Sequence, residues 1–242
     1  MKVEDIKKGK EKISVLTCYD YSFAKAIDGL VDIVLVGDSV ANVVYGDENT
    51  REMIIYDMIR HTGAVAKGIS KSLIVADMPF GSDTEDKVID NAKRLIRAGA
   101  HAVKVEGKPS IIKLLVENGI KVMGHVGLLP QTAEEMRKYG KDDKEAKEIL
   151  QQAKDIEEAG AFALVIESVP DSLAGIITSQ VKIPTIGIGA GKECDGQVLV
   201  LYDMLGLFDK VPGFAKKYVS LNNMIKDAVG RYSKEVKEGK FP

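Results

Sequence analysis

Six ionisable side chains in this sequence stand at the ends of short apolar runs. They are Asp38 after IVLVG, Asp77 after LIVA, Lys104 and Glu106 within AVKVEG, His125 within VMGHVG, and Glu167 after ALVI. One such residue alone is explained by a turn or a helix cap, where short polar side chains are favoured. A series of them is harder to explain in that way, because in a parallel barrel all strand ends open onto one rim, which carries the active site. We interpret the six as a candidate active site.

The residue types indicate a metal site next to an anion site. Asp38 and Asp77 supply hard oxygen ligands, and neither has a His or Cys nearby in its motif, which favours Mg²⁺ over Zn²⁺. Lys104 and Glu106 are two residues apart, so they share one face of a strand. If Glu106 turns to the metal through water, Lys104 is placed to hold an anionic substrate group. The alternative for this pair is a salt bridge inside the barrel.

The sequence indicates a role for Glu167 more clearly than it does for His125. Glu167 follows a very apolar run, and such surroundings suit a general base that works near neutral pH. For His125 a polar contact with the substrate and a structural role are equally good interpretations. His61 and His101 lie in helical or strand-start settings, which favours a structural role for both. The glycine-rich stretch IGIGAGKECDG (186–196) lacks the full dinucleotide fingerprint, so close backbone packing explains it better.

The elements that must position these residues are short apolar runs that alternate with segments of helical period. The runs predict eight strands, at 13–17, 32–38, 72–78, 101–107, 121–128, 162–168, 183–189 and, less clearly, 197–203. Near-continuous apolar strands alternating with helices are typical of a parallel sheet covered by helices. Eight such units in 242 residues fit an α/β fold of the closed (β/α)₈ type, the TIM barrel, better than an open sheet.

Helix signals lie between the strands. Ser82 and Glu85 have the spacing of a capping box before an apolar face that runs from Val88 to Ile96, and Gly99 is a plausible stop. Residues 144–159 repeat this plan, and residues 221–237 predict a final helix that could pack against a neighbouring subunit.

An internal repeat supports the closed barrel. Residues 98–106 read AGAHAVKVE and residues 159–167 read AGAFALVIE, so Glu106 and Glu167 occupy equivalent positions. Self-similarity of this kind is expected of equivalent units arranged around an axis. No Pro-, Gly- or Ser-rich linker interrupts the chain. We therefore expect residues 1–242 to form a single barrel domain with a C-terminal helix.

Composition excludes several classes of protein. The 34 basic and 36 acidic residues are scattered, which leaves no basic stripe for nucleic acid. No apolar run approaches the roughly 20 residues that span a bilayer, so we expect no membrane association. The two cysteines, Cys18 and Cys194, have no partner at metal-ligand spacing, and a reduced, cytoplasmic protein is the default expectation.

The same residues lie in blocks that strongly resemble the ketopantoate hydroxymethyltransferase family. The blocks are LTCYDYSFAKAID (16–28), DIVLVGDSVANVVYG (32–46), HTGAVAKG (61–68), VADMPFGS (75–82), AGAHAVKVEG (98–107), VMGHVGLLPQ (122–131), LVIESVP (164–170) and IPTIGIGAGKECDGQVLVLYDMLG (183–206). They occur in the family's order and extend from about residue 12 to residue 220.

This resemblance implies a barrel of the phosphoenolpyruvate/pyruvate superfamily. It implies hydroxymethyl transfer from 5,10-methylenetetrahydrofolate to 3-methyl-2-oxobutanoate, through a Mg²⁺-stabilised enolate, in pantothenate synthesis. It also implies a large homo-oligomer, expected to be a decamer. Residue by residue, the implied roles are metal ligands for Asp38 and Asp77, a metal-associated carboxylate for Glu106, substrate contacts for Ser39 and Lys104, and proton acceptor for Glu167.

The sequence departs from the family in two loops: the loop after DMPF is short, at GSDTED, and the rim segment after the GLxPQ block differs. The family carries a GG-aromatic-x-x-QG stretch after the GLxPQ block, whereas here QTAEEMRKYGKDDKEAKEIL follows directly. Contacts with the folate could differ there, while the metal set is unchanged. Two rival functions stay open: a Mg²⁺-dependent lyase or mutase acting on another 2-oxo acid, and a catalytically silent barrel. A reactive loop cysteine would favour the first, and loss of Asp38, Asp77 or Glu167 would favour the second.

Overall fold

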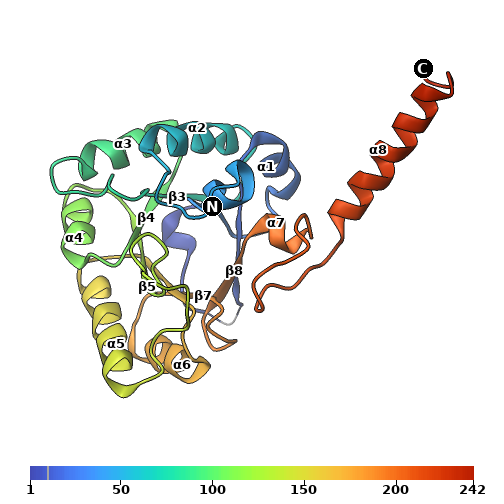
Figure 1. Cartoon of the computed structure of the whole chain (residues 1–242). Helices are drawn as coiled ribbons and strands as arrows, with labels where there is room; N and C mark the ends of the chain where they lie inside the picture. The colour runs from blue at the N-terminus through green and yellow to red at the C-terminus, as the bar shows by residue number, and fades with distance from the viewer. Residues whose placement is uncertain (10) are drawn as a thin grey trace. The chain divides into compact units, whose positions relative to one another are not determined.

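The barrel is the central feature of the computed structural model, which describes residues 1–9 and 11–242 (Figure 1). Eight strands pair in sequential order and close into a barrel, which confirms the predicted fold. The seven pairings between successive strands are all parallel. The strands are β1 (Ile13–Thr17), β2 (Ile33–Val36), β3 (Leu73–Asp77), β4 (Ala102–Glu106), β5 (Val122–Gly127), β6 (Ala163–Glu167), β7 (Thr185–Ile188) and β8 (Gly196–Leu199).

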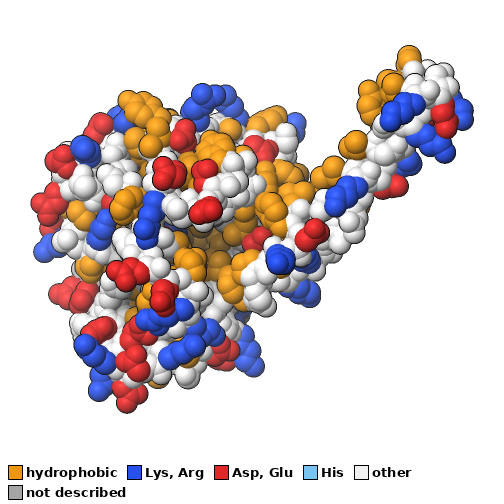
Figure 2. All heavy atoms as spheres, in the orientation of Figure 1, with side chains coloured by type: hydrophobic (Ala, Val, Ile, Leu, Met, Phe, Trp, Pro, Cys, Tyr) orange, Lys and Arg blue, Asp and Glu red, His pale blue; other side chains and the backbone are white. Residues whose placement is uncertain are grey.

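Helices alternate with the strands along the chain. They are α1 (Tyr21–Ile27), α2 (Ile55–Ala66), α3 (Val88–Ala98), α4 (Pro109–Glu117), α5 (Asp143–Glu158), α6 (Asp171–Gln180), α7 (Leu201–Met204) and α8 (Leu221–Lys237), with a short 3-10 helix, η1 (Val3–Asp5), and a short π-helix, η2 (Ala41–Tyr45). Within the described ranges none of these helices combines the length and the apolar character that crossing a lipid bilayer requires. On the face shown in Figure 2, acidic and basic side chains are interspersed.

The chain divides into two compact units, Met1–Val198 and Leu199–Pro242. The first holds most of the barrel, and the second holds α7 and α8. The expectation of one domain over residues 1–242 therefore stays a prediction. The final helix matches its predicted bounds of 221–237, and none of its side chains is buried.

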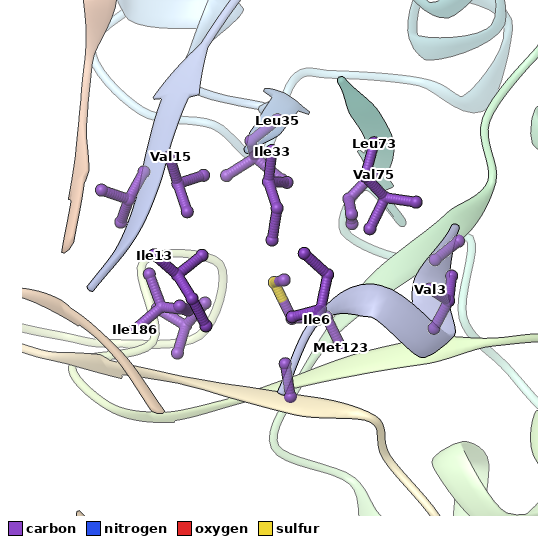
Figure 3. Packing of buried hydrophobic residues seen from close by; sticks show 14 residues of the cluster. Val3, Ile6, Ile13, Val15, Ile33, Leu35, Leu73, Val75, Met123 and Ile186 are labelled. Carbon is purple, nitrogen blue, oxygen red and sulfur yellow. The ribbon is translucent and has the colours of Figure 1, made fainter. Parts of the chain in front are cut away.

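Apolar side chains at alternate strand positions fill the half of the barrel interior that lies at the N-terminal ends of the strands. This alternation follows from the pleat of the strands. Ile13 and Val15 of β1, Ile33 and Leu35 of β2, and Leu73 and Val75 of β3 belong to this buried cluster. Ile6, which follows η1, points in among them, with Val3 beside it (Figure 3). The N-terminal end of the barrel is thus closed by hydrophobic packing, and any polar chemistry is confined to the other end.

Two local predictions were wrong. Ser82 does not cap α3, which begins at Val88, because the Ser82 hydroxyl instead donates to the carbonyl of Pro79 within the turn after β3. The run 197–203 is a strand only to Leu199, after which the chain turns into α7. Gly99 does end α3, with a left-handed φ of 119°.

Candidate active site

Above the apolar cluster, the next inward positions of β3 to β6 are polar or charged. Strand register places Asp77 beside Lys104 and Glu106 beside His125, and it pairs Glu167 with Gly127. Gly127 adopts a φ of 93°, and a Cβ atom there would lie 2.2 Å from the carbonyl oxygen of Glu167, so only glycine fits beside that residue. The sequential strand order therefore brings the predicted residues together at one rim.

Asp38, Asp77 and Lys104 form the first part of the site. The Lys104 ammonium lies 2.9 Å from Asp77 Oδ1, and both side chains are almost fully buried. The other Asp77 oxygen, Oδ2, accepts a hydrogen bond of 3.0 Å from the backbone N–H of Asp38. Burial alone would lower the pKa of Lys104, but the charges of Asp77 and Glu106 raise it above its usual value. Lys104 is therefore held as a cation.

The surroundings of Asp38 disfavour its charged form, whereas those of Lys104 favour the charged form. Burial, followed by the negative charge of Asp77, raises the pKa of Asp38 to about 8. Two carboxylates this close, with only one lysine beside them, are unfavourable unless further positive charge compensates for their repulsion. A bound cation would supply that charge.

His125 joins the second part of the site. Its Nε2 lies 3.2 Å from Glu167 Oε2 and its Nδ1 lies 3.6 Å from Glu106 Oε1. Neither ring nitrogen has a well-aligned hydrogen bond within the described chain. Burial lowers the pKa of His125, but its two carboxylate neighbours outweigh burial and raise it to about 9. Glu167 differs from the others in that its side chain is 16% exposed, so it faces the open mouth of the barrel.

Ser39 and Tyr19 meet at the edge of this cluster. The Ser39 hydroxyl lies 2.8 Å from the Tyr19 hydroxyl, and the Tyr19 side chain is buried. Tyr19 in turn is fixed through its backbone carbonyl, which lies 2.6 Å from His61 Nδ1. His61 is thus a structural residue in the described protein. Tyr19 was not predicted as a site residue from the sequence, although the motif CYDY directly follows the first strand.

Gln131 is a second residue that was missed. It is buried in the segment after β5, where its amide donates to Asp38 Oδ2 at 2.8 Å and its backbone N–H donates to Glu106 Oε2 at 3.1 Å. It lies in a loop, so no strand or helix period marks it. The only available signal was its place in the GLLPQ block.

The residues present fit a hard divalent cation. In the part of the chain that the structure describes, no three His, Cys, Asp or Glu side chains already form a metal-binding cluster. Mg²⁺, however, needs only one or two carboxylates, because it retains several water ligands. Asp38 and Asp77 supply two adjacent carboxylates and Glu106 a third nearby, and their combined charge exceeds that of Lys104. All of these donors are oxygen atoms, which suits Mg²⁺ better than Zn²⁺.

A pocket opens beside Gly127, the register partner of Glu167, in the segment that departs from the family pattern. It has a volume of about 380 Å³ and is lined by Gly127, Leu129 and five residues of the segment 132–139. The backbone N–H of Tyr139 donates to the carbonyl of Ser168, which fixes this segment next to the end of β6. The guanidinium of Arg137 lies over the Tyr139 ring, 3.9 Å from its centroid.

The fold and the polar rim together define a class, the (β/α)₈ barrels with charged side chains at the carboxyl ends of their strands. A 2,3-dimethylmalate lyase, described as a member of the PEP mutase/isocitrate lyase superfamily, superimposes with a TM-score of 0.63 at 15% identity, covering 98% of this chain and 86% of its own. A phosphonopyruvate hydrolase does so with a TM-score of 0.68 at 12% identity, over 98% and 86% of the two chains. Identities this low show the shared fold alone.

Sequence comparison identifies the family within that class. The ketopantoate hydroxymethyltransferase family matches residues 1–242, and the chain belongs to it. A 3-methyl-2-oxobutanoate hydroxymethyltransferase of Thermococcus kodakarensis is 50% identical over 97% of this chain and 86% of its own. One of Clostridium botulinum is 49% identical over 99% and 91%. The chain is therefore an enzyme, a transferase of this family.

Proposed function

We propose that the enzyme transfers a hydroxymethyl group to 3-methyl-2-oxobutanoate, with 5,10-methylenetetrahydrofolate as the one-carbon donor, and so forms 2-dehydropantoate for pantothenate synthesis. The observation that supports this reaction is the arrangement of two carboxylates, a lysine and a separate glutamate around one buried rim. Asp38 and Asp77 face Lys104, while Glu167 stands apart beside His125. Such a division suits a substrate with an anionic end and an acidic C–H bond.

Glu167 is the base in this proposal. Its carboxylate removes the C3 proton of the keto acid and holds it on an oxygen atom. His125, 3.2 Å from Glu167 Oε2, orients that carboxylate and compensates for its charge before the proton arrives. Because the Glu167 side chain is partly exposed, substrate can reach it from the mouth of the barrel.

Lys104 stabilises negative charge on the substrate oxygens. It remains protonated beside Asp77, which suits electrostatic stabilisation of an enolate and opposes formation of a Schiff base, since that reaction requires a neutral amine. Borohydride reduction in the presence of the keto acid is therefore expected to leave Lys104 unmodified. Trapping of the substrate on Lys104 would replace this part of the mechanism.

Asp38 and Asp77 would hold Mg²⁺, with Glu106 contacting it through water, and Ser39 would bind the substrate carboxylate. When bound, the ion would polarise the keto group and make the C3 proton more acidic. Glu106 accepts a hydrogen bond from the backbone N–H of Gln131, which keeps its carboxylate directed into the site.

The donor would enter through the pocket beside Gly127. The enolate carbon C3 and the oxygen of one water each form a bond to the methylene carbon of the folate, and both carbon–nitrogen bonds of that carbon break. The proton taken from C3 and one proton of the water go to the two nitrogen atoms, so the products are 2-dehydropantoate and tetrahydrofolate. The pocket of about 380 Å³ is lined in part by Gly127, the register partner of Glu167, and this proximity supports the proposed route.

Proton exchange isolates the first step of this reaction. In D₂O with Mg²⁺, the enzyme is expected to exchange the C3 proton of 3-methyl-2-oxobutanoate, followed by proton NMR, and a chelator should stop the exchange. Glu167→Gln should abolish it, while Glu158→Gln, on the exposed face of α5, should exchange at the wild-type rate.

Absence of exchange even with tetrahydrofolate added would contradict the proposal. It would favour either a lyase or mutase that acts on a different 2-oxo acid or a silent barrel. Exchange that survives Glu167→Gln would retain the reaction but assign the base elsewhere.

A further inference from the structure

We propose that Gln131 is a positioning residue of the metal site, which fixes the carboxylates of Asp38 and Glu106 relative to each other. This inference rests on the proposed function, since it assumes that these two residues hold or approach Mg²⁺. Only 2% of Gln131 is exposed. Its hydrogen bonds therefore form without competition from bulk water.

The Gln131 amide connects the ends of two strands. Its nitrogen donates to Asp38 Oδ2 at 2.8 Å and to the backbone carbonyl of Met78 at 2.9 Å. Both N–H bonds are therefore used, one on Asp38, two residues after the end of β2, and one on Met78, the residue after β3. Rotation of the amide would break at least one of these bonds, so the Asp38 carboxylate is held in one orientation.

The backbone of the same residue reaches a third strand. The N–H of Gln131 donates to Glu106 Oε2, at the end of β4, at 3.1 Å. A single residue thus contacts two of the three carboxylates assigned to the ion and the chain next to the third, Asp77. The other oxygen of Asp38 is left for the ion, whereas the other oxygen of Glu106, Oε1, faces His125 Nδ1 at 3.6 Å.

Arg51 anchors Gln131 from outside the barrel. Its Nε donates to the Gln131 carbonyl at 3.0 Å, and one terminal nitrogen donates to the carbonyl of Ala133 at 2.7 Å. The guanidinium therefore ties the segment after β5 to the segment before α2. This explains how a loop residue is held firmly enough to orient two side chains.

A simple packing role for Gln131 makes a different prediction from a positioning role. A residue that only fills space affects the folding of the metal-free protein, whereas a residue that orients ligands affects metal affinity. Outer partners of metal ligands typically contribute about 10- to 100-fold to affinity or activity. Metal affinity and metal-free stability must therefore be measured separately.

The test compares Gln131→Met, which keeps the size of the side chain but removes its N–H donors, with the wild type. Gln151→Met, the same change on the exposed face of α5, is the matched control. Manganese binding is followed by the EPR signal of free Mn²⁺, and thermal unfolding is recorded with a chelator present. We expect Gln131→Met to weaken Mn²⁺ binding about 10- to 100-fold and the control to bind like the wild type.

A Gln131→Met protein that binds Mn²⁺ within twofold of the wild type would overturn the inference, whatever its melting temperature. If this variant fails to fold, Gln131→Asn provides the same comparison, because its shorter amide cannot reach Asp38 while it keeps its polarity. A wild-type protein that binds no Mn²⁺ would instead refute the metal site of the proposed function. The two failures are therefore distinguishable.

Discussion

Lys104 shows how strongly a single residue of this site depends on its partner. Its ammonium and the Asp77 carboxylate are 2.9 Å apart and only 6% and 4% exposed. Removing one member of a buried pair costs about 3 to 5 kcal/mol when the other charge is left uncompensated, and the lower end of this range applies here because Glu106 and Asp38 remain beside Lys104. The pair is thus a structural element of the barrel as well as a part of the site.

Asp77→Asn is expected to lower the free energy of unfolding by about 3 kcal/mol, measured by urea denaturation with a chelator present. Asp90→Asn is the control, because Asp90 and Arg97 form a solvent-exposed pair 3.9 Å apart, and a change within about 0.5 kcal/mol is expected there. Equal stability of Asp77→Asn and wild type would show that the buried pair contributes nothing to folding.

The cysteines allow a second test at this scale. Burial raises the pKa of Cys18 to about 11 and also raises the pKa of Cys194. Because only the thiolate reacts and the raised pKa keeps the thiol protonated at pH 8, labelling by a disulfide reagent should be at least about 100-fold slower than for free cysteine. In guanidinium chloride both thiols should react at the free rate. Fast labelling of the folded enzyme would mean that one cysteine is accessible.

At the scale of elements, β5 and α5 meet at a glycine. A Cβ atom on Gly124 would lie 2.3 Å from Ile156 Cγ2, so the helix can approach the strand only because residue 124 has no side chain. Gly124→Ala should therefore lower the free energy of unfolding by about 1 to 3 kcal/mol through overpacking. Chemical denaturation measures this loss.

The controls for Gly124 come from the same chain. Gly230→Ala lies within α8, where an added Cβ meets nothing within 4 Å, and should stabilise by about 0.5 to 1 kcal/mol. In a double variant, Ile156→Ala should recover part of the loss caused by Gly124→Ala, since it removes the clashing atom. Simple additivity of the two losses would show that the helix moves instead.

The sequence predicts elements better than their junctions. All eight strands were found. The runs of β2 to β7 are almost fully buried and read as continuous apolar segments, whereas β1 and β8 each expose one residue, Ser14 and Gln197, and their remaining residues still marked the run. The start of α3 was misplaced because Ser82 has a local alternative, the carbonyl of Pro79, that competes with helix capping. Among the candidate site residues, those on strands were found from register and position, whereas Gln131, a loop residue, required coordinates.

For the whole molecule, the proposed metal should act as a stabilising ligand. Free Mg²⁺ at about 100 times its dissociation constant adds about 2.7 kcal/mol of stability, which for a chain of this length raises the melting temperature by roughly 5 to 10 °C. Calorimetry with Mg²⁺ and then with excess chelator measures the shift. Asp38→Asn should abolish it, and an equal shift in that variant would locate the ion elsewhere.

The predicted homo-oligomer can be tested through α8. Met224, Ile225, Val229, Tyr232 and Val236 are exposed large hydrophobic side chains on this helix. We expect light scattering to give a mass of about ten chains, and Val229→Asp to reduce it, because a buried charge would oppose packing against another subunit. Lys226→Asp should leave the mass unchanged. A monomeric wild type would contradict the expectation.

The sequential strand order also governs when the site can exist during protein synthesis. Its charged residues lie between Asp38 and Glu167, but the barrel closes only when β8, beginning at Gly196, joins β7 and β1. Until the ribosome has released that strand, Asp77, Lys104 and Glu106 stay hydrated, so the desolvation of their charges falls on the last step of folding. Nascent chains that stall before Gly196 should therefore be unable to capture the ion or the keto acid.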